Sequence, residues 1–488
     1  MLPDIDKIKS LLLYDAHSPM IFNSGVFLFF FFAFLLMYRA VYRNKEARTI
    51  YLLLFSLYFL YKSSGLYFLL LVLSAAVDFY LANLIYRAER PGIRKALVIT
   101  SVVMNLGFLG YFKYTNFLLQ LFTNIGLGHF DFADIFLPVG ISFYTFQSLS
   151  YTIDIYRGKL IPARRFSDFC FYVSFFPHLV AGPIVRAADF LPQIEGDRYI
   201  SREDIGKALF LILTGLFRKA VIADYISVNF VDRVFSSPLQ FSGVENLLGI
   251  YAYAIQIYCD FSGYSDMAIG VALLLGYRLK INFDAPYQSA SITEFWRRWH
   301  ISLSSWLRDY LYISLGGNRK GKIRQYFNLM MTMLLGGLWH GASWKFVFWG
   351  WMHGVALMVD KAFESIFHLR RTRLTRVLGV ALTFHFVCFC WIFFRADSFE
   401  TAMAMVQQIL FSFNAGVFVQ WVAGYSNVFI LILLGFVLHF IPTEIDHKVE
   451  KFIAWLPWPG KSFALASIIW LIIQVKSADI LPFIYFQF

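Results

Sequence analysis

Two histidines, His340 and His353, lie in the apolar stretch LLGGLWHGASWKFVFWGWMHG, residues 334–354. A neutral imidazole can take a proton from a hydroxyl and pass it on, which acyl transfer to an alcohol requires. His340 is followed by the small residues 341–343, which let backbone or substrate approach closely. A continuous helix would separate the two histidines by about 20 Å, so a shared metal site would need a sharp break at Gly341. Residue chemistry alone leaves open whether His340 is catalytic or a packing residue.

The composition indicates that these histidines lie in a membrane protein. Of 488 residues, 59% are hydrophobic, 20% aromatic and only 15% charged, whereas soluble domains average nearer half apolar and a quarter charged. Continuously apolar runs of helical-span length predict an all-α polytopic bundle with about eleven spans, some of them re-entrant or interfacial. The runs lie near residues 24–38, 49–61, 66–86, 96–113, 207–227, 244–276, 325–340, 343–363, 376–394, 426–441 and 463–476.

The net charge of +12 follows the expected topology. The connectors 39–48 and 87–95 are basic, while the connector between them carries the single Lys62. The positive-inside rule then places the two basic loops in the cytoplasm and the N-terminus outside. We therefore attribute the positive charge to the orientation of the chain in the membrane and expect no nucleic-acid partner.

No residue-type pattern indicates a metal centre or a removable leader. The four cysteines lie in or beside apolar runs without metal-ligand spacing, so we expect buried, inert thiols and no metal. The N-terminal stretch lacks the charged, apolar and small-residue regions of a cleaved signal peptide. No linker of domain length interrupts the chain, which predicts one membrane domain, residues 1–488, with a polar core near 137–355 and peripheral spans 24–113 and 376–488.

Polar residues, which are costly in a bilayer and usually mark function or a water-filled cavity, gather in the middle of the chain. In the first polar segment, 137–158, Gln147, Tyr151 and Asp154 follow i, i+4, i+7 spacing and would share one helix face. In the second, 175–186, prolines and a glycine break the helix and leave His178 beside unwound backbone.

The third polar segment, 257–270, places two carboxylates inside an apolar run. Asp260 and Asp266 would each need a cationic partner, such as an arginine from residues 292–325. Ser262 and Tyr264 lie on the same stretch as further substrate-channel candidates. Polar contacts that only hold helices together remain an equal alternative for this segment.

The fourth polar segment, 292–325, combines tryptophans with arginines and lysines. Arg297, Arg298 and Trp299 belong to a pattern that predicts an amphipathic helix at the headgroup level, before a turn at residues 316–318. Its basic face would contact anionic membrane lipids, an acidic carrier protein or the phosphates of a coenzyme. The sequence favours none of these over the others.

Four motifs occur in one order: FPHLVAGPI, YCDFSGYSDMAIG, FWRRWHISLSSWLRDYLYISLGGNRKG and GLWHGASWKFVFWGWMHG. Together they resemble the membrane-bound O-acyltransferase (MBOAT) family, most closely its bacterial branch that O-acetylates alginate or D-alanylates teichoic acid. The resemblance runs from about residue 20 to about residue 400 and is strongest for the alginate O-acetylation proteins. It implies a helical bundle with a funnel on each membrane face and a thin core between them.

The resemblance also implies roles for individual residues. The family's near-invariant histidine matches His340, which would be the catalytic base. The second family position matches His300, which would help position acyl donor or acceptor. His353 and His178 match recurrent family histidines whose roles are less defined. These two histidines are candidates for the substrate channel, as are the polar-segment residues Gln147, Tyr151, Asp260, Asp266, Trp299, Arg297 and Arg298.

The expected reaction follows from these matches. No cofactor would be bound; acetyl-CoA, or an acyl-carrier thioester from a cytoplasmic carrier protein, would donate the acyl group to a polysaccharide acceptor. A separate periplasmic SGNH-like acetyltransferase would complete the transfer. The protein would be a multi-pass component of the bacterial cytoplasmic (inner) membrane.

Three alternatives remain open on sequence grounds. D-alanyl transfer to teichoic acid and O-acetylation of peptidoglycan both fit the same branch. A transporter or export channel without covalent chemistry is the alternative from another class. Neither an internal repeat nor paired broken helices are evident, which disfavours the transporter.

Overall fold

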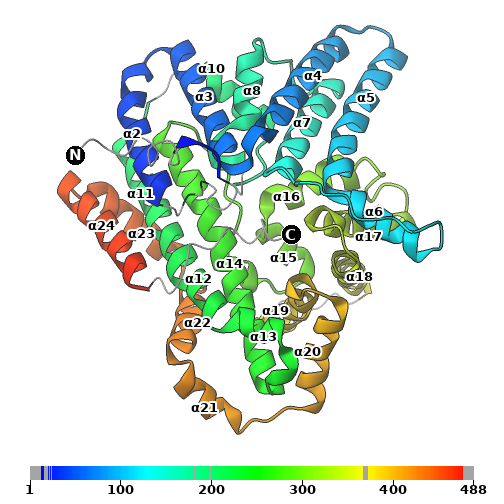
Figure 1. Cartoon of the computed structure of the whole chain (residues 1–488), viewed down its shortest axis with the longest axis vertical. Helices are drawn as coiled ribbons and strands as arrows, with labels where there is room; N and C mark the ends of the chain where they lie inside the picture. The colour runs from blue at the N-terminus through cyan, green and yellow to red at the C-terminus, as the bar shows by residue number, and fades with distance from the viewer. Residues whose placement is uncertain are drawn as a thin grey trace. The chain divides into compact units, whose positions relative to one another are not determined.

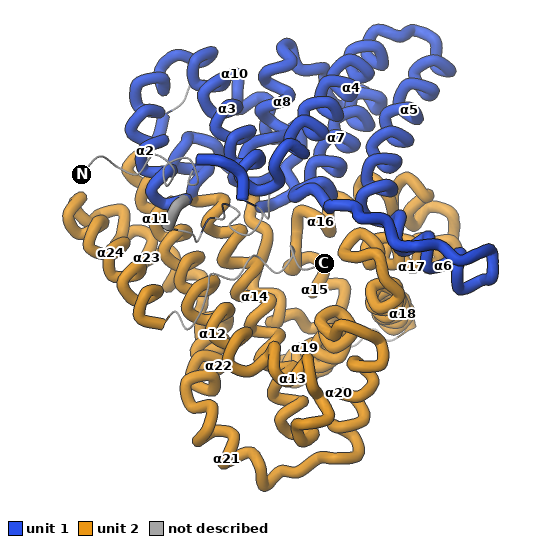
Figure 2. The backbone as a smooth tube through the Cα atoms, viewed as in Figure 1, with its two compact units in different colours: residues 1–200, 271–279 blue, residues 201–270, 280–488 orange. Residues whose placement is uncertain are grey.

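The computed structural model describes residues 12–15, 20, 22, 25–179, 182–196, 199–366 and 372–475. All regular elements in these ranges are helices, and no strand occurs there, which confirms the predicted all-α class. The chain divides into two compact units, unit 1 with residues 1–200 and 271–279, and unit 2 with residues 201–270 and 280–488 (Figure 2). This division concerns compactness alone, so the single membrane domain stays a prediction.

Unit 1 is a set of helices, of which α4, α5 and α7 run side by side (Figure 1). Its elements are α2 Gly25–Val41, α3 Lys45–Ser64, η1 Gly65–Tyr67, α4 Phe68–Arg87, α5 Pro91–Leu109, the π-helical η2 Gly110–Tyr114, α6 Thr115–Asn124, α7 Ile141–Tyr156, α8 Phe166–Ser174, α9 Phe176–Leu179 and α10 Ala187–Glu195. Local chemistry sets their starts. The Asn44 side chain caps α3 by accepting from two backbone N–H groups, and Pro91 opens α5, where its missing N–H is harmless.

A buried polar network joins α4, α5 and α7. Ser101 Oγ donates to Asp78 Oδ1 at 2.6 Å, and Asn105 Nδ2 donates to Asp78 Oδ2 at 2.8 Å. Ser101 Oγ also lies 3.0 Å from Thr152 Oγ1. Because a buried carboxylate is tolerated only when it is hydrogen-bonded, these contacts fix the mutual position of the three helices.

Unit 2 contains the remaining helices. They are α11 Arg202–Leu216, η3 Phe217–Ala223, α12 Asp224–Ile226, η4 Ser227–Val231, α13 Asp232–Ser236, η5 Pro238–Gln240, α14 Gly243–Leu274, η6 Pro286–Gln288, α15 Ile292–Arg298, α16 Ile301–Trp306, η7 Leu307–Tyr312, α17 Lys322–His340, α18 Trp344–Ile366, α19 Arg373–Arg395, α20 Phe399–Phe411, α21 Val417–Gly424, α22 Ser426–His439, α23 Thr443–Trp455 and α24 Trp458–Val475. The last four residues of α14 belong to unit 1. The elements η3, η4 and η7 are π-helical, a form that is frequent at functional sites.

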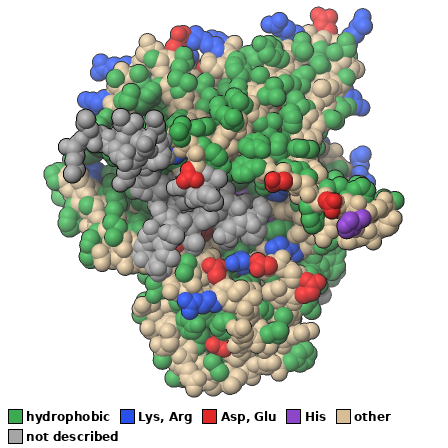
Figure 3. Space-filling model, viewed as in Figure 1, with side chains coloured by type: hydrophobic (Ala, Val, Ile, Leu, Met, Phe, Trp, Pro, Cys, Tyr) green, Lys and Arg blue, Asp and Glu red, His purple; other side chains and the backbone are tan. Residues whose placement is uncertain are grey.

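Several helices have the length and composition of membrane spans. Among the described residues, four stretches are long and apolar enough to cross a membrane: Lys45–Arg87, Pro91–Asn124, Arg373–Arg395 and Trp458–Val475. A fifth is added if the bent pair α21–α22 is one span. Over α4 and α5 the surface is largely hydrophobic (Figure 3), with side chains such as Leu73, Leu84 and Val103 exposed to the surroundings. Apolar surface of this extent indicates contact with lipid. The predicted count of about eleven spans stays a prediction.

Candidate active site

The helices α17 and α18 form an antiparallel hairpin whose tip carries His340. α17 ends at His340, and α18 begins four residues later at Trp344. Two glycines let the helices approach closely: a Cβ at Gly337 would lie 2.2 Å from the backbone oxygen of Phe346, and one at Gly350 would lie 2.4 Å from that of Met333. The chain is therefore sharply broken between His340 and Trp344, and α17 and α18 are not one continuous helix.

This break changes the expected relation between His340 and His353. The His340 ring lies 5.1 Å from the Trp349 ring, and the His353 ring lies 4.7 Å from the same indole, measured between centroids. The separation of about 20 Å that a continuous helix would give therefore does not apply, because the helix is broken between the two histidines. The hairpin folds the two imidazoles onto one tryptophan.

The small residues after His340 serve packing within the hairpin. A Cβ at Gly341 would lie 2.0 Å from the ring of Phe346, which in turn packs against Phe394 at 5.2 Å between centroids. At Gly341 the close approach is made by an aromatic ring of the protein, and the prediction that residues 341–343 admit substrate stays a prediction.

His300 lies in a break between α15 and α16. Its backbone adopts the left-handed conformation, with φ 44° and ψ 55°, which no residue inside a right-handed helix can adopt. The prediction of an amphipathic helix before the turn at residues 316–318 is wrong in one respect, because this part of the chain folds as two short helices and a π-helical turn. The expected turn is confirmed, with positive φ at Gly316 and Gly317 before α17 begins.

Two tryptophans connect three of the predicted histidines. The Trp339 ring lies 6.1 Å from His300 and 5.1 Å from His340, between centroids. Trp349 adds the contact between His340 and His353 described above. All three histidines are buried. Unit 2 thus brings together the two predicted catalytic residues and one predicted channel residue in aromatic surroundings from which bulk water is excluded.

The buried ring of His353 has two nitrogens that make no hydrogen bond to the described residues. It is fully buried against the rings of Phe295, Trp296 and Trp349. Among the described residues neither of its ring nitrogens has a hydrogen-bond partner, and the same is true of the indole nitrogens of both tryptophans. Buried polar atoms without a protein partner are uncommon and call for an explanation, such as an ordered water, a bound ligand or a catalytic role.

The carboxylates of α14 are paired, although not with the predicted arginines. Lys219 Nζ lies 2.5 Å from Asp260 and 2.7 Å from Asp224, and Arg218 lies 2.8 Å from Asp266. Their cations come from η3, and the expectation of partners from residues 292–325 is wrong. The adjacent lysine and arginine inside an apolar run were a signal that the sequence reading missed.

The same helix supports the site directly. The ring of Phe261, next to Asp260, packs against His300 at 4.6 Å between centroids. Ser262 and Tyr264 are buried on α14. The ion pairs of Asp260 and Asp266 therefore also stabilise the part of α14 that packs against His300.

The predicted residues of the fourth polar segment separate into two groups. Trp299 is buried and contacts the rings of Phe283 and Trp391 at 5.0 and 5.1 Å. Arg297 is exposed, and Arg298 forms an ion pair with Glu294 at 2.9 Å. Only the tryptophan belongs to the aromatic surroundings of the histidines.

The remaining predicted residues lie in unit 1. Gln147 and Tyr151 are buried on α7, where the Tyr151 hydroxyl accepts from the backbone N–H of Ala163 at 2.9 Å. His178 is fully buried on α9, the single turn that follows the predicted break. Its ring nitrogens, like the side-chain amide of Gln147, have no hydrogen-bond partner among the described residues.

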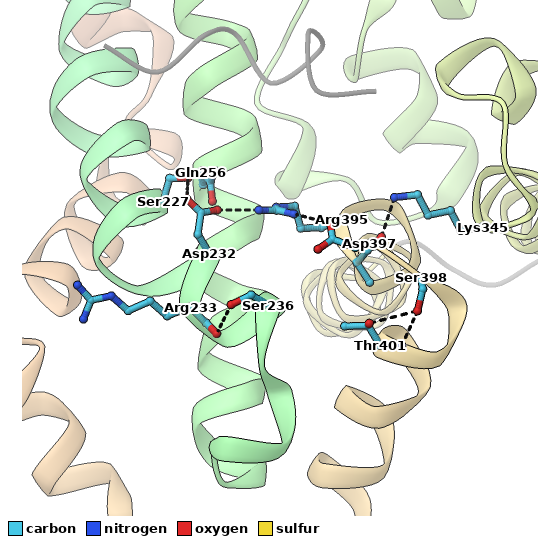
Figure 4. Close-up of polar contacts among 11 residues, drawn as sticks. Ser227, Asp232, Arg233, Ser236, Gln256, Lys345, Arg395, Asp397, Ser398 and Thr401 are labelled. Carbon is cyan, nitrogen blue, oxygen red and sulfur yellow. Dashed lines mark hydrogen bonds and ion pairs between the residues drawn. The ribbon is translucent and has the colours of Figure 1, made fainter. Parts of the chain in front are cut away.

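A second charged network fixes the start of α18 beside the end of α19 (Figure 4). Arg395 donates to Asp232 at 2.7 Å and lies 3.6 Å from Asp397. Lys345 Nζ donates to the backbone oxygen of Ala396 at 2.7 Å. Because the neighbouring Phe394 contacts the His340 ring at 5.3 Å, this network positions one wall around that histidine. The sequence analysis had not singled out these residues.

Comparison with known proteins adds a family and named relatives. The sequence model of "MBOAT, membrane-bound O-acyltransferase family" matches residues 165–403. The probable alginate O-acetylase AlgI of Pseudomonas aeruginosa is 42% identical over 404 residues, which cover 81% of this chain and 75% of that protein. The peptidoglycan O-acetyltransferase of Helicobacter pylori is 36% identical over 80% of this chain and 79% of its own length. The teichoic acid D-alanyltransferase of Bacillus subtilis is 29% identical over 54% of this chain and 69% of its own length.

Proposed function

We propose that this chain, which belongs to the membrane-bound O-acyltransferase family, transfers an acetyl group from a cytoplasmic thioester to hydroxyls of a cell-surface or exported polysaccharide. The protein is a multi-pass membrane O-acyltransferase. Relatives named for alginate and peptidoglycan O-acetylation support the choice of acetyl group and of polysaccharide. The D-alanyltransferase match is weaker in identity and coverage.

One observation carries the proposal: the buried imidazole of His340 lies at a helix break and shares one tryptophan with each of two other histidines. In the proposed reaction His340 removes the proton of the acceptor hydroxyl. The oxygen attacks the thioester carbonyl, a C–O bond forms, the C–S bond breaks, and the departing thiolate takes up the proton. The aromatic surroundings exclude water, which would otherwise hydrolyse the thioester.

The donor, the partner and the orientation are parts of the same proposal. Acetyl-CoA or an acyl-carrier thioester would approach from the cytoplasm, where positive loops are expected, through a funnel on that face. The acceptor, or a separate periplasmic SGNH-like acetyltransferase that receives the acetyl group, would approach from the other side. The protein would lie in the inner membrane with its N-terminus in the periplasm.

The test compares His340→Gln with His385→Gln. His385 is exposed on α19 and its Nδ1 contacts only a carbonyl of its own helix among the hydrogen bonds of the described residues, so it is a matched control. General-base catalysis contributes about 10²- to 10⁴-fold, and we expect His340→Gln to lower surface-glycan acetylation by at least that lower factor at equal protein level. Unchanged acetylation would exclude the assignment and favour a transport function.

A donor assay separates the remaining enzymatic alternative. Membranes that contain the protein are supplied with labelled acetyl-CoA or with a D-alanyl-carrier thioester, and label is followed into polymer. Label from the carrier thioester alone would favour D-alanyl transfer.

A further inference from the structure

The side chain of Asn282 contacts one ring nitrogen of His300. His300 Nδ1 lies 3.2 Å from Asn282 Oδ1. The orientation of the Asn282 amide is fixed independently, because the backbone N–H of Ser302 donates to the same oxygen at 3.1 Å. An N–H group cannot donate to an amide nitrogen, so the atom that faces His300 is the carbonyl oxygen.

The other contacts of Asn282 agree with this orientation. Ser302 Oγ donates to Asn282 Oδ1 at 2.9 Å, and Asn282 Nδ2 donates to Ser265 Oγ of α14 at 3.3 Å. Ser302 Oγ also lies 3.4 Å from His300 Nδ1, but its contact with Asn282 Oδ1 is shorter, and its single proton serves that bond. An unprotonated Nδ1 would place its lone pair against the lone pairs of that carbonyl oxygen. A protonated Nδ1 instead donates a hydrogen bond to it, and in a neutral imidazole Nε2 is then the nitrogen without a proton.

The backbone holds His300 in place against its unfavourable conformation. The N–H of Ile301 donates to the Asn282 carbonyl oxygen at 2.9 Å, and the N–H of Asp284 donates to the Arg298 carbonyl oxygen at 3.0 Å. These two bonds join the segment 282–284 to the residues that flank His300. A non-glycine residue with φ 44° persists only where its surroundings impose that conformation, and such residues cluster at functional sites.

We propose that Asn282 is a positioning residue that keeps His300 in the Nδ1-protonated tautomer, so that Nε2 accepts a hydrogen bond from a hydroxyl of the acyl acceptor. The assignment rests on the proposed function for the identity of that hydroxyl, but the tautomer follows from the contacts alone. Burial lowers the pKa of His300 to about 3, which agrees with an imidazole that stays neutral at physiological pH. Asn282 was not predicted as a site residue, since it lies in a short connector outside every expected span.

The tautomer is tested without substrate. In the full-length protein with ¹⁵N-labelled histidine rings, comparison with His300→Gln identifies the His300 resonances. We expect a protonated Nδ1 and an unprotonated Nε2 in the wild type, and a shift toward the Nε2-protonated form in Asn282→Leu. An unprotonated Nδ1 in the wild type, or an unchanged tautomer in Asn282→Leu, would overturn the proposal.

Kinetics of two variants separate positioning from simple structural support. Asn282→Leu should lower kcat at least about 10-fold, as expected when the group that orients a catalytic imidazole is lost. Asn282→Asp keeps the acceptor oxygen and should recover most of kcat, while its negative charge stabilises protonated His300 and moves the acid limb of the pH profile to higher pH. Asn414→Leu, at an exposed loop position, is the control and should change neither. An Asp variant with the activity of the Leu variant and an unmoved pH profile would also overturn the proposal.

The assignment of the His300 tautomer and the proposed function can fail independently of each other. If the protein transfers no acyl group but His300 shows the expected tautomer, the function is wrong and the assignment of the tautomer stands. If transfer occurs and the tautomer is the other one, only the role of Asn282 is wrong.

Discussion

Replacing Lys219 by Met removes the cation that neutralises two carboxylates inside unit 2. Lys219 Nζ lies 2.5 Å from Asp260 and 2.7 Å from Asp224, and the three side chains are 2%, 5% and 20% exposed. The lysine and the two aspartates together carry one net negative charge. Without the lysine, both carboxylates would lose the cation that they share, and Asp260 would remain almost fully buried.

The magnitude follows from this burial. Removing one member of a buried ion pair costs about 3–5 kcal/mol, because the remaining charge has lost its partner without regaining water. We expect Lys219→Met to lower the free energy of unfolding by this amount. Lys361 is a matched control, since it pairs with Glu364 at 2.8 Å with the two side chains 30% and 65% exposed, and exposed pairs contribute about 0–1 kcal/mol.

The assay is unfolding of the purified protein in mixed micelles with increasing dodecyl sulfate, followed by far-ultraviolet circular dichroism. In the Lys219→Met background, a second change of Asp260→Asn removes one uncompensated charge and should recover at least about 1 kcal/mol. A Lys219→Met protein within about 1 kcal/mol of the wild type, or a double variant less stable than the single one, would refute the reasoning.

Three further outcomes follow from local contacts. Gly350→Ala should destabilise the hairpin by about 1–3 kcal/mol in the same unfolding assay, because its Cβ would lie 2.4 Å from an α17 carbonyl oxygen, whereas Gly424→Ala, with open space around it, should not. Arg395→Gln should cost only about 1 kcal/mol, since Arg395 and Asp232 are 16% and 39% exposed; a larger coupling in a double-variant cycle with Asp232→Asn would contradict this. Because burial lowers the pKa of His300 to about 3, the unfolded chain binds its proton first, and stability falls as pH drops below about 6.5. Between pH 7 and 5 the free energy of unfolding of the His300→Gln protein should fall by about 2 kcal/mol less than that of the wild type. Equal decreases in the two proteins would show that protonation of His300 is not the cause.

The sequence predicted those features that follow from composition and local chemistry. The all-α membrane class followed from apolar runs, and the turn at Gly316 and Gly317 followed from residue types that tolerate positive φ. The break beside His178 followed from nearby prolines and glycine. The histidines 300, 340 and 353 were all selected in advance, although only the hairpin reveals that they share two tryptophans.

The features that could not be predicted from the sequence depend on contacts between distant segments. Asp260 pairs with a lysine 41 positions earlier in the chain, and no local pattern specifies that distance. Asp78 was a detectable signal, because a carboxylate inside an apolar run needs buried partners, but Ser101 and Asn105 come from the next helix. The π-helical turn at residues 217–223 adds a further obstacle, since it shifts side chains away from the 3.6-residue period on which face assignments rest.

Under the proposed function, two of the histidines would divide the chemical work. A base that holds a proton during transfer needs a pKa near the working pH, and burial lowers that of His300 to about 3. Its Nδ1 is engaged with Asn282, so His300 can orient a hydroxyl through Nε2 but is poorly suited to keep the proton. Under the proposed function the proton would pass to His340, which contacts the same Trp339 ring. Placing orientation and proton transfer on separate imidazoles lets His300 remain neutral throughout the reaction, so no net charge has to form on that side of the aromatic surroundings.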